Sequence, residues 1–337
     1  MSRSNPNTPQ NRADWREWQL YRAITPKTLL FAFLAFVLLT WSANNTEMDK
    51  AALETGKAVL SIVGIGESDV LQGVSKFGAQ AFPLQISTRT ELSRVQALDL
   101  DNLPWLSYIE EGVQRKYNAF NDTWTEEPVQ YLVEPIGYLN KVLWMMWETI
   151  EMGFWGTLIS VIISLPLGIL AAKNFSPHPV VYQIARSILS FHRAMPELIL
   201  ALFLVLIYGF GPIAGILALA IHTSGVLGKF FADEIENAPK GPQMALKSAG
   251  AHSLKVLRYA VLPHVLPAWI AYIQYIFERN IRTATVLGIV GAGGIGMELK
   301  GRWDLFDYGH VSTILLIIFI SVVLLEAFSQ RLRSKTL

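Results

Sequence analysis

The residues of this chain that could do chemistry are charged side chains inside long apolar segments. They are His192, Arg193, Glu197, Glu278, Arg279 and Arg282. Arg193 and Glu197 are four residues apart, so one helix would place them on the same face, where they can pair, and Glu278 and Arg282 form a second such pair with the same spacing. Pro196 has no N–H group to donate and predicts a kink or a broken helix. A charge at the centre of a membrane helix costs roughly 2.5–3.5 kcal/mol, so it is kept mainly where it faces protein or a water-filled path.

Two interpretations of these charges are open. In the first, they line a translocation pathway in which Arg193, Arg282 and His192 face a small tetrahedral oxyanion, because a planar guanidinium group matches phosphonate or phosphite oxygens. In the second, they form structural ion pairs that lock helices together and never meet a substrate. His222, a lone histidine in another apolar segment, is predicted to be a hydrogen-bonded interior residue rather than a substrate ligand.

Several classes of function are disfavoured by what the sequence lacks. It has no cysteine, which excludes thiol catalysis and disulfides, and its 6 histidines show no metal-ligand spacing, so no metal site is expected. A net charge of +1 without a basic, aromatic cluster gives no indication of nucleic-acid binding. No GxxxxGK[ST] motif occurs, so the chain does not bind ATP through a P-loop, and we do not expect an enzyme.

The sequence GAGGIG at 291–296 fits the dinucleotide-binding pattern GxGxxG, but its context contradicts that function. A true fingerprint follows a strand, opens a helix and has an acidic residue about twenty positions later. Here another apolar segment begins near Val311. We expect instead an external glycine-rich turn in which helix ends pack tightly.

Composition and hydropathy predict an all-α membrane protein with six transmembrane helices. The chain of 337 residues is 52% hydrophobic and 16% charged, with a mean hydropathy of +0.34. Its apolar segments are 28–44, 149–172, 184–210, 213–228, 261–287 and 308–325. Basic residues in the loop after the second segment, in the loop before the fifth and in the C-terminal tail place these parts in the cytoplasm, as the positive-inside rule requires.

The first apolar segment separates two polar regions. Residues 1–27 are predicted to be a cytoplasmic segment, and this long polar leader favours an uncleaved anchor at 28–44 over a signal peptide. Residues 45–140 form an extracytoplasmic insert with 14 Asp and Glu against 7 Lys and Arg. The insert either touches a binding protein or packs on the membrane domain. Its predicted pieces are short strands or buried loops at 60–66 and 81–87 and helices at 90–96 or 106–117.

Residues 230–269 are predicted to form a docking loop, because their centre is polar and basic although they lie between two apolar segments. Pro239 ends one helix and Pro242 starts another. Small residues from Ala245 to Ala251 keep that short helix thin, so another protein could approach its backbone closely. Ser253 is expected to cap a second helix.

This loop resembles the EAA motif of ABC-transporter permeases, in which a coupling helix sits in a cleft of the ATPase subunit. Ala245, Gly250 and the pair at 262–263 carry the resemblance. Met244 stands where the family usually has Glu, and Leu246 stands where it has its second Ala.

Three further segments, at 192–202, 209–236 and 278–296, resemble the phosphonate-type permeases more specifically, and the likeness covers about residues 148–333. It implies a type I importer permease core with a coupling loop at 230–263. The residues implied to contact the ATPase are Met244, Ala245, Leu246, Gly250, Ala251, Leu262 and Pro263.

The resemblance also implies a multi-pass protein of the bacterial inner membrane that imports phosphonate, phosphite or a phosphate ester. The implied partners are two copies of an ATPase subunit, an extracytoplasmic substrate-binding protein and a second permease copy in a homodimer. The chain itself would need no cofactor, because ATP and Mg²⁺ bind to the ATPase. ATP binding would then shift the pathway from inward-open to outward-open.

Other hypotheses stay open at this point. The chain could be a permease for another small solute, a secondary transporter or channel that works without ATP, or a membrane scaffold whose insert is the active part. Inverted repeats would favour a secondary transporter, but the two halves show no convincing self-similarity. Stimulation of a partner ATPase by this chain would distinguish among these classes.

Overall fold

A computed structural model describes residues 26–62, 67–94, 103–118 and 123–336. The chain forms two compact units, Met1–Phe77 and Gly78–Leu337, and each is described by itself. Most of the predicted cytoplasmic segment 1–27 lies outside the described residues, as do positions 63–66 and 95–96 of the predicted insert elements.

The described part of the first unit is helical. α1 (Pro26–Asn45) has the length and composition of a membrane span, as predicted for residues 28–44. The chain turns at Glu47, whose φ is 55°, and α2 (Met48–Ile62) follows. α3 (Asp69–Ala81), whose last residues belong to the second unit, begins with an acidic residue, which stabilises the positive end of the helix dipole. The prediction of a strand or loop at 60–66 is therefore wrong at its start, which is helical.

A small antiparallel sheet follows in the second unit, with the strand order β1-β3-β2. Its elements are β1 (Thr88–Glu91), the 3-10 turn η2 (Leu92–Arg94), β2 (Tyr108–Asn118) and β3 (Thr123–Glu134). The predicted helix at 106–117 is wrong, because cross-strand pairs such as Tyr117 with Trp124 and Ile109 with Leu132 decide the structure there. Of the helix predicted at 90–96, residues 90–91 belong to β1 and residues 92–94 form the 3-10 turn. The chain is otherwise mostly helical, so this sheet is the departure from an all-α protein.

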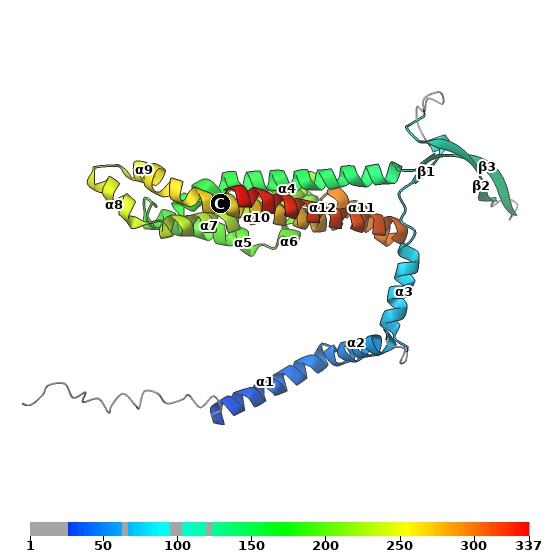
Figure 1. The fold of residues 1–337 in the computed structure, drawn as a ribbon, viewed down its shortest axis with the longest axis horizontal. Coiled ribbons are helices and arrows are strands. Elements are labelled where there is room, and N and C mark those ends of the chain that lie inside the picture. Colours follow the sequence, from blue (N-terminus) through cyan, green and yellow to red (C-terminus); the bar gives the residue numbers. More distant parts are fainter. Residues whose placement is uncertain (1–25, 63–66, 95–102, 119–122, 337) are drawn as a thin grey trace, which may run out of the picture. The chain divides into compact units, whose positions relative to one another are not determined.

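The rest of the second unit is helical. Its elements are α4 (Gly137–Leu170), α5 (Pro179–Ala194), α6 (Glu197–Tyr208), α7 (Pro212–Asn237), α8 (Lys240–Ser248), α9 (Ser253–Val256), η3 (Leu257–Val261), α10 (Leu262–Ile289), α11 (Gly294–Asp304) and α12 (Tyr308–Thr336). Among the described residues, 5 helical segments could cross a membrane, and the bent pair α5 and α6 makes up to 6. This agrees with the six predicted spans when the bent pair counts as one. Figure 1 shows α8 and α9 together at one end of the helical bundle.

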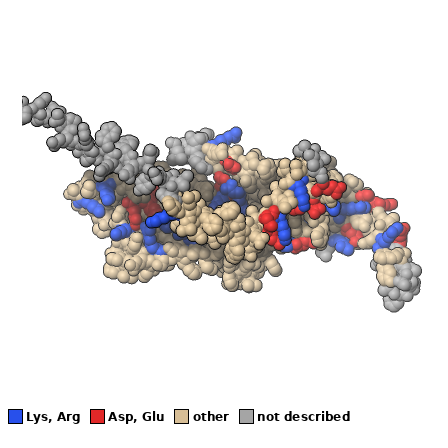
Figure 2. All heavy atoms as spheres, turned by 90° about the horizontal axis from the view of Figure 1, so that it is seen from below, with Lys and Arg blue, Asp and Glu red and all other residues tan. Residues whose placement is uncertain are grey.

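The surface has the character expected next to lipid. Much of the face seen in Figure 2 carries no Lys, Arg, Asp or Glu, and the charged side chains gather in groups. Large apolar side chains are exposed on the long helices, among them Leu206 at 82%, Trp144 at 67% and Phe319 at 67%. Inside a bilayer such side chains face acyl chains and carry no cost of exposure to water.

Small residues allow the membrane helices to approach one another closely. A Cβ added to Gly153 of α4 would lie 2.6 Å from Ile281 of α10, and one on Gly156 would lie 2.8 Å from Leu219 of α7. Lipid tails are as apolar as leucine, so such close van der Waals contact replaces the hydrophobic effect as the force between helices. α4 is thereby packed against both α7 and α10.

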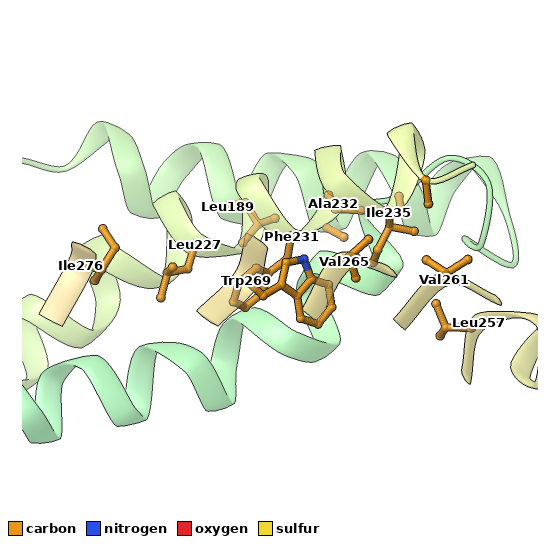
Figure 3. Packing of buried hydrophobic residues seen from close by; sticks show 14 residues of the cluster. Leu189, Leu227, Phe231, Ala232, Ile235, Leu257, Val261, Val265, Trp269 and Ile276 are labelled. Atoms are coloured by element: carbon orange, nitrogen blue, oxygen red, sulfur yellow. The ribbon is translucent and has the colours of Figure 1, made fainter. Parts of the chain in front are cut away.

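A hydrophobic cluster fixes α7 and α10 at the two ends of the predicted docking loop (Figure 3). The predicted bounds 230–269 are too wide, because residues 230–237 belong to α7 and residues 262–269 to α10. Phe231 of α7 and Trp269 of α10 stack with their ring centroids 4.3 Å apart and are 0% and 3% exposed. Val261, Val265 and Leu189 belong to the same cluster. The docking loop therefore leaves and re-enters one packed core.

The glycine-rich segment 291–296 is buried and contains the turn that follows α10 and the first residues of α11. Gly291, Gly293 and Gly294 have φ values of 92°, 85° and 67°, which other residues rarely adopt. A Cβ on Gly293 would lie 2.8 Å from the backbone nitrogen of Pro212. The expected tight packing of this turn is confirmed, a helix rather than a strand precedes it, and its placement on the external side stays a prediction. α11 itself was not predicted.

Candidate functional site

The third predicted span is broken at Pro196. α5 ends at Ala194, α6 begins at Glu197, and the two helices are bent by 88°. Met195 between them is extended, with ψ at 117°, because the residue before a proline avoids the α region. The predicted break at Pro196 is confirmed.

Three polar side chains from three helices meet at this bend, and we call them the bend cluster: Glu197 of α6, His222 of α7 and Arg279 of α10. Arg279 Nη2 lies 3.0 Å from Glu197 Oε1 and 3.2 Å from Glu197 Oε2. His222 Nε2 lies 2.7 Å from Glu197 Oε2, and His222 Nδ1 lies 2.8 Å from the carbonyl oxygen of Met195. The Glu197, His222 and Arg279 side chains are 22%, 11% and 31% exposed.

The hydrogen bonds of the bend cluster determine its charge. A carbonyl oxygen only accepts, so His222 Nδ1 donates to Met195. The contact between His222 Nε2 and the carboxylate requires a second proton, which is carried by either His222 or Glu197. In both cases this pair is neutral as a whole. Arg279 then gives the bend cluster a net charge of +1.

The prediction that Arg193 pairs with Glu197 is wrong. The bend turns Glu197 toward α7 and α10, while Arg193 is exposed and has no ion pair with any residue that the structure describes. His192 points to α7, where its Nδ1 lies 2.8 Å from Ser224 Oγ. His222 is buried and hydrogen-bonded as predicted, but its place beside Glu197 was not foreseen because its partners come from other helices.

A hollow of about 360 Å³ opens beside the bend cluster. Its lining includes Glu197, Leu198, Arg279, Arg282, Thr283 and Val286. Arg282 Nη1 lies 2.8 Å from Glu278 Oε1, which confirms the pairing predicted from their spacing. Of the six predicted pathway residues, three line this hollow and Glu278 pairs with one of them. His192 and Arg193 are not among its lining residues.

α8 ends in a Schellman motif at Gly250. The N–H of Gly250 donates to the carbonyl of Lys247 at 3.0 Å, and the N–H of Ala251 donates to that of Leu246 at 2.9 Å. Gly250 has a φ of 80°, and a Cβ there would meet nothing within 4 Å. Backbone conformation, rather than lack of space, therefore requires glycine at this position.

The implied ATPase-contact residues lie at or near the surface. Met244, Ala245, Gly250 and Pro263 are exposed, and Leu246, Ala251 and Leu262 are half-buried. Gln243 is buried, and its amide donates to the carbonyls of Ala238 and Pro239, which holds the start of α8. The predicted cap is wrong by one residue, because His252 Nδ1 accepts from the Leu254 N–H ahead of Ser253.

A π-helical turn, η3, joins α9 to α10. The N–H of Leu262 donates to the carbonyl of Leu257, five residues earlier. Pro263 follows, and in a regular helix its ring would clash with the carbonyl four residues before it. The wider turn relieves this clash, so the sequence at 262–263 shapes the return of the loop into the membrane.

Charged side chains also tie α7 to the α4–α5 connection, a contact that the sequence did not predict. Arg186 Nη2 lies 3.2 Å from Asp233 Oδ1 and 3.0 Å from Glu236 Oε1, and its Nε donates to the carbonyl of Ala171. Glu236 also accepts from the Lys173 N–H at 2.7 Å. The end of α7 that leads into α8 is therefore linked to α4 and α5.

A second polar group, which we call the α11 network, consists of Lys141, Glu298, Arg302, Asp307 and His310. Lys141 Nζ lies 2.9 Å from Glu298 Oε2, and Arg302 Nε lies 3.0 Å from Glu298 Oε1. Asp307 Oδ2 lies 2.9 Å from Arg302 Nη1 and 2.7 Å from His310 Nδ1. Burial alone would raise the pKa of Asp307, but its close contacts with His310 and Arg302 outweigh burial and lower this pKa. The network joins α4, α11 and α12.

Comparison with known proteins identifies the family. Residues 164–334 match the family described as binding-protein-dependent transport system inner membrane component. The chain is 49% identical over 260 residues, 75% of this chain and 99% of the relative, to a putative phosphite transport system permease protein, HtxE, of Stutzerimonas stutzeri. It is 45% identical over 186 residues, 55% of this chain and 68% of the relative, to the phosphite transport system permease protein PtxC of the same organism.

More distant similarities extend this result. The phosphate-import permease protein PhnE of Mycolicibacterium smegmatis is 41% identical over 186 residues, which are 55% of this chain and 35% of that protein. A structure of the inward-facing MetNI methionine ABC transporter matches with a TM-score of 0.51 at 22% identity, covering 58% of this chain and 96% of that chain, and shows the same fold. This multi-pass chain therefore belongs to the family of binding-protein-dependent transport system inner membrane components.

Proposed function

We propose that this permease carries phosphite, or a related small phosphorus oxyanion such as a phosphonate, across the inner membrane. The observation that supports this proposal is the positive charge around the hollow beside the bend cluster. The bend cluster has a net charge of +1, and the pair of Arg282 and Glu278 adds none, so an anion entering the hollow meets uncompensated positive charge. Planar guanidinium groups match the oxygens of a tetrahedral anion in geometry as well as in charge.

The names of relatives favour this substrate class over other solutes. Two of them are phosphite permeases, one of these putative, and a third is a phosphate-import permease. The buried charges could also serve as ion sites in a transporter that works without ATP. The match to binding-protein-dependent transport components argues against that alternative.

We infer that transport is driven by a separate ATPase subunit and supplied by an extracytoplasmic binding protein. Two permease copies would pair around the pathway, and each would present α8 to one ATPase copy. Met244 is 61% exposed on this helix, so contact at the position where the family usually has Glu would be apolar rather than ionic. ATP and Mg²⁺ would bind only to the ATPase, whose closure would move α8 and, through η3 and the Arg186 contacts, α7 and α10.

Uptake by the reconstituted complex tests the proposed substrate and its driving force. The permease, its ATPase and its binding protein are placed in liposomes, and uptake of labelled phosphite is measured with and without ATP, with methylphosphonate and sulfate as competitors. We expect ATP-dependent uptake that methylphosphonate inhibits and sulfate does not. Uptake against a gradient without nucleotide hydrolysis, or indifference to phosphorus oxyanions, would contradict the proposal.

Gly250 tests the docking role of α8. Gly250→Ala strains a left-handed residue by about 1–2 kcal/mol and should therefore disturb the end of α8. We expect lower affinity for the ATPase and lower substrate-stimulated ATP hydrolysis. Gly241→Ala is the matched control, because Gly241 also has nothing within 4 Å but lies inside the helix. Equal ATPase affinity and equal substrate-stimulated ATP hydrolysis in the two variants would contradict a coupling role for this turn.

A further inference from the structure

The carboxylate of Glu197 occupies Arg279 in the way that a substrate oxyanion would. Both of its oxygens lie within 3.2 Å of Arg279 Nη2. A carboxylate and a phosphorus oxyanion present similar pairs of acceptor oxygens to a guanidinium group. In the absence of substrate, the arginine is therefore held by an internal anion.

Only one edge of Arg279 is used in this contact. Its Nη2 donates to both carboxylate oxygens, while its Nε and Nη1 have no hydrogen-bond partner among the described residues. Arg279 lines the hollow of about 360 Å³ together with Arg282 and Thr283. An anion entering the hollow can therefore reach Arg279 before Glu197 has left it.

His222 gives Glu197 an alternative partner. Its Nε2 lies 2.7 Å from Glu197 Oε2, and its ring is fixed by the bond from Nδ1 to the Met195 carbonyl. When an anion takes over Arg279, the carboxylate keeps a charge-assisted hydrogen bond and is not left buried without a partner. This lowers the cost of displacing it.

We propose that Glu197 is a displaceable latch: a substrate oxyanion competes with its carboxylate for Arg279 and thereby releases α6 from α10. The proposal rests on the proposed function, since it needs an oxyanion in the hollow. The side chains of α6 beyond Glu197 are apolar apart from Tyr208, so the contact with Arg279 is the ion pair that holds this helix to α10. The extended backbone at Met195 and Pro196 is the point about which α6 can then turn.

The test uses the absence of cysteine from the chain, which lets two introduced cysteines be labelled selectively. Spin labels are placed at Leu206 of α6 and Tyr275 of α10, which are 82% and 50% exposed. The distance between the labels is measured in the assembled permease and ATPase complex in nanodiscs while phosphite is added. We expect phosphite to shift the distance distribution of the wild type. The phosphite concentration at half-shift is the quantity compared among variants.

Two variants should change this midpoint in opposite directions. Glu197→Gln removes the competing charge, so the shifted population should appear without phosphite and the midpoint should fall by about tenfold, the value of one charge-assisted hydrogen bond. His222→Asn removes the partner that receives the released carboxylate, so the midpoint should rise. Glu151→Gln, whose carboxylate bonds only to Trp147 of its own helix α4 among the described contacts, is the control and should leave the midpoint unchanged.

The outcomes distinguish the latch from a purely structural role of Glu197 and His222. They also distinguish a failure of the latch from a failure of the proposed function. Damage to packing would raise the midpoint in both variants, and that result, or unchanged midpoints, would overturn the latch. If Glu197→Gln does not assemble, Glu197→Asp takes its place, because its shorter carboxylate reaches Arg279 less well and should also lower the midpoint, which packing damage would raise. If wild-type liposomes take up no phosphorus oxyanion, the proposed substrate fails, whereas uptake with the same midpoint in all variants refutes the latch alone.

Discussion

The bend cluster and the α11 network both contain Arg, Glu and His but differ in how completely their arginines are bonded. Arg302 of the α11 network is bonded through Nε to Glu298 and through Nη1 to Asp307, and its guanidinium lies 5.0 Å from the ring centre of Tyr138. Arg279 of the bend cluster is bonded through Nη2 alone. In the α11 network, Glu298 and Asp307 balance the charges of Lys141 and Arg302, whereas the bend cluster keeps a net charge of +1. Bonding of an arginine through two of its nitrogens to two acids suits a structural lock, whereas bonding through one nitrogen beside a hollow leaves room for a ligand.

Loss of Arg279 should have the largest effect on transport. Arg279→Gln removes the uncompensated charge of the bend cluster, and we expect the initial rate of phosphite uptake to fall by about 100-fold, the equivalent of a charged hydrogen bond of about 3 kcal/mol. Assembly with the ATPase is measured on the same preparation by size-exclusion chromatography. Near-normal uptake by the assembled variant would make the bend cluster a structural lock, and the contrast with the α11 network would disappear.

Loss of Arg302 should instead reduce stability. Arg302→Gln leaves Glu298 and Asp307 short of a partner, and we expect a loss of about 2 kcal/mol, less than for a fully buried pair because the arginine is 27% exposed. Thermal unfolding of the detergent-solubilised complex measures this loss. The substrate concentration at half-maximal uptake should stay unchanged in the folded fraction. A change in that concentration would place the α11 network in the pathway.

Arg282 should have an intermediate role, because it lines the hollow but is already paired within α10. Arg282→Gln should raise the phosphite concentration at half-maximal uptake by roughly fivefold, the upper range for a partly exposed charge. Arg282→Lys keeps the charge and should recover part of this loss. Unchanged affinity and rate in both variants, with assembly intact, would remove Arg282 from the pathway.

The smallest effect concerns the acid sensitivity of the α11 network. The pKa of folded Asp307 lies below its unfolded value, so its ionisation stabilises the fold above the unfolded pKa of about 3.9, and this stabilisation is lost as the pH falls. The difference in melting temperature between wild type and Asp307→Asn should therefore be constant from neutral to mildly acidic pH and narrow below about pH 4. A difference that does not depend on pH would contradict the charged role of Asp307.

Local chemistry made much of the fold predictable. The helices that could cross a membrane match the predicted apolar segments, because hydropathy over about twenty residues does not depend on distant partners. The tight turn at 291–296 followed from glycine and the break at 196 from proline. The sequence analysis missed the sheet of the insert because the strand conformation of Tyr117 and Ile109 depends on their partners on β3 and not on their neighbours in sequence.

The two predicted ion pairs show where sequence reasoning stops. Both had a spacing of four residues, and the rule behind them assumes an unbroken helix. α10 is continuous between Glu278 and Arg282, and that pair forms. Pro196 breaks the helix between Arg193 and Glu197, so Glu197 takes Arg279, 82 residues away. The sequence determined which charges lie within the membrane, whereas only the packing of α6 against α7 and α10 decided which of them meet, because a bend redirects every side chain beyond it.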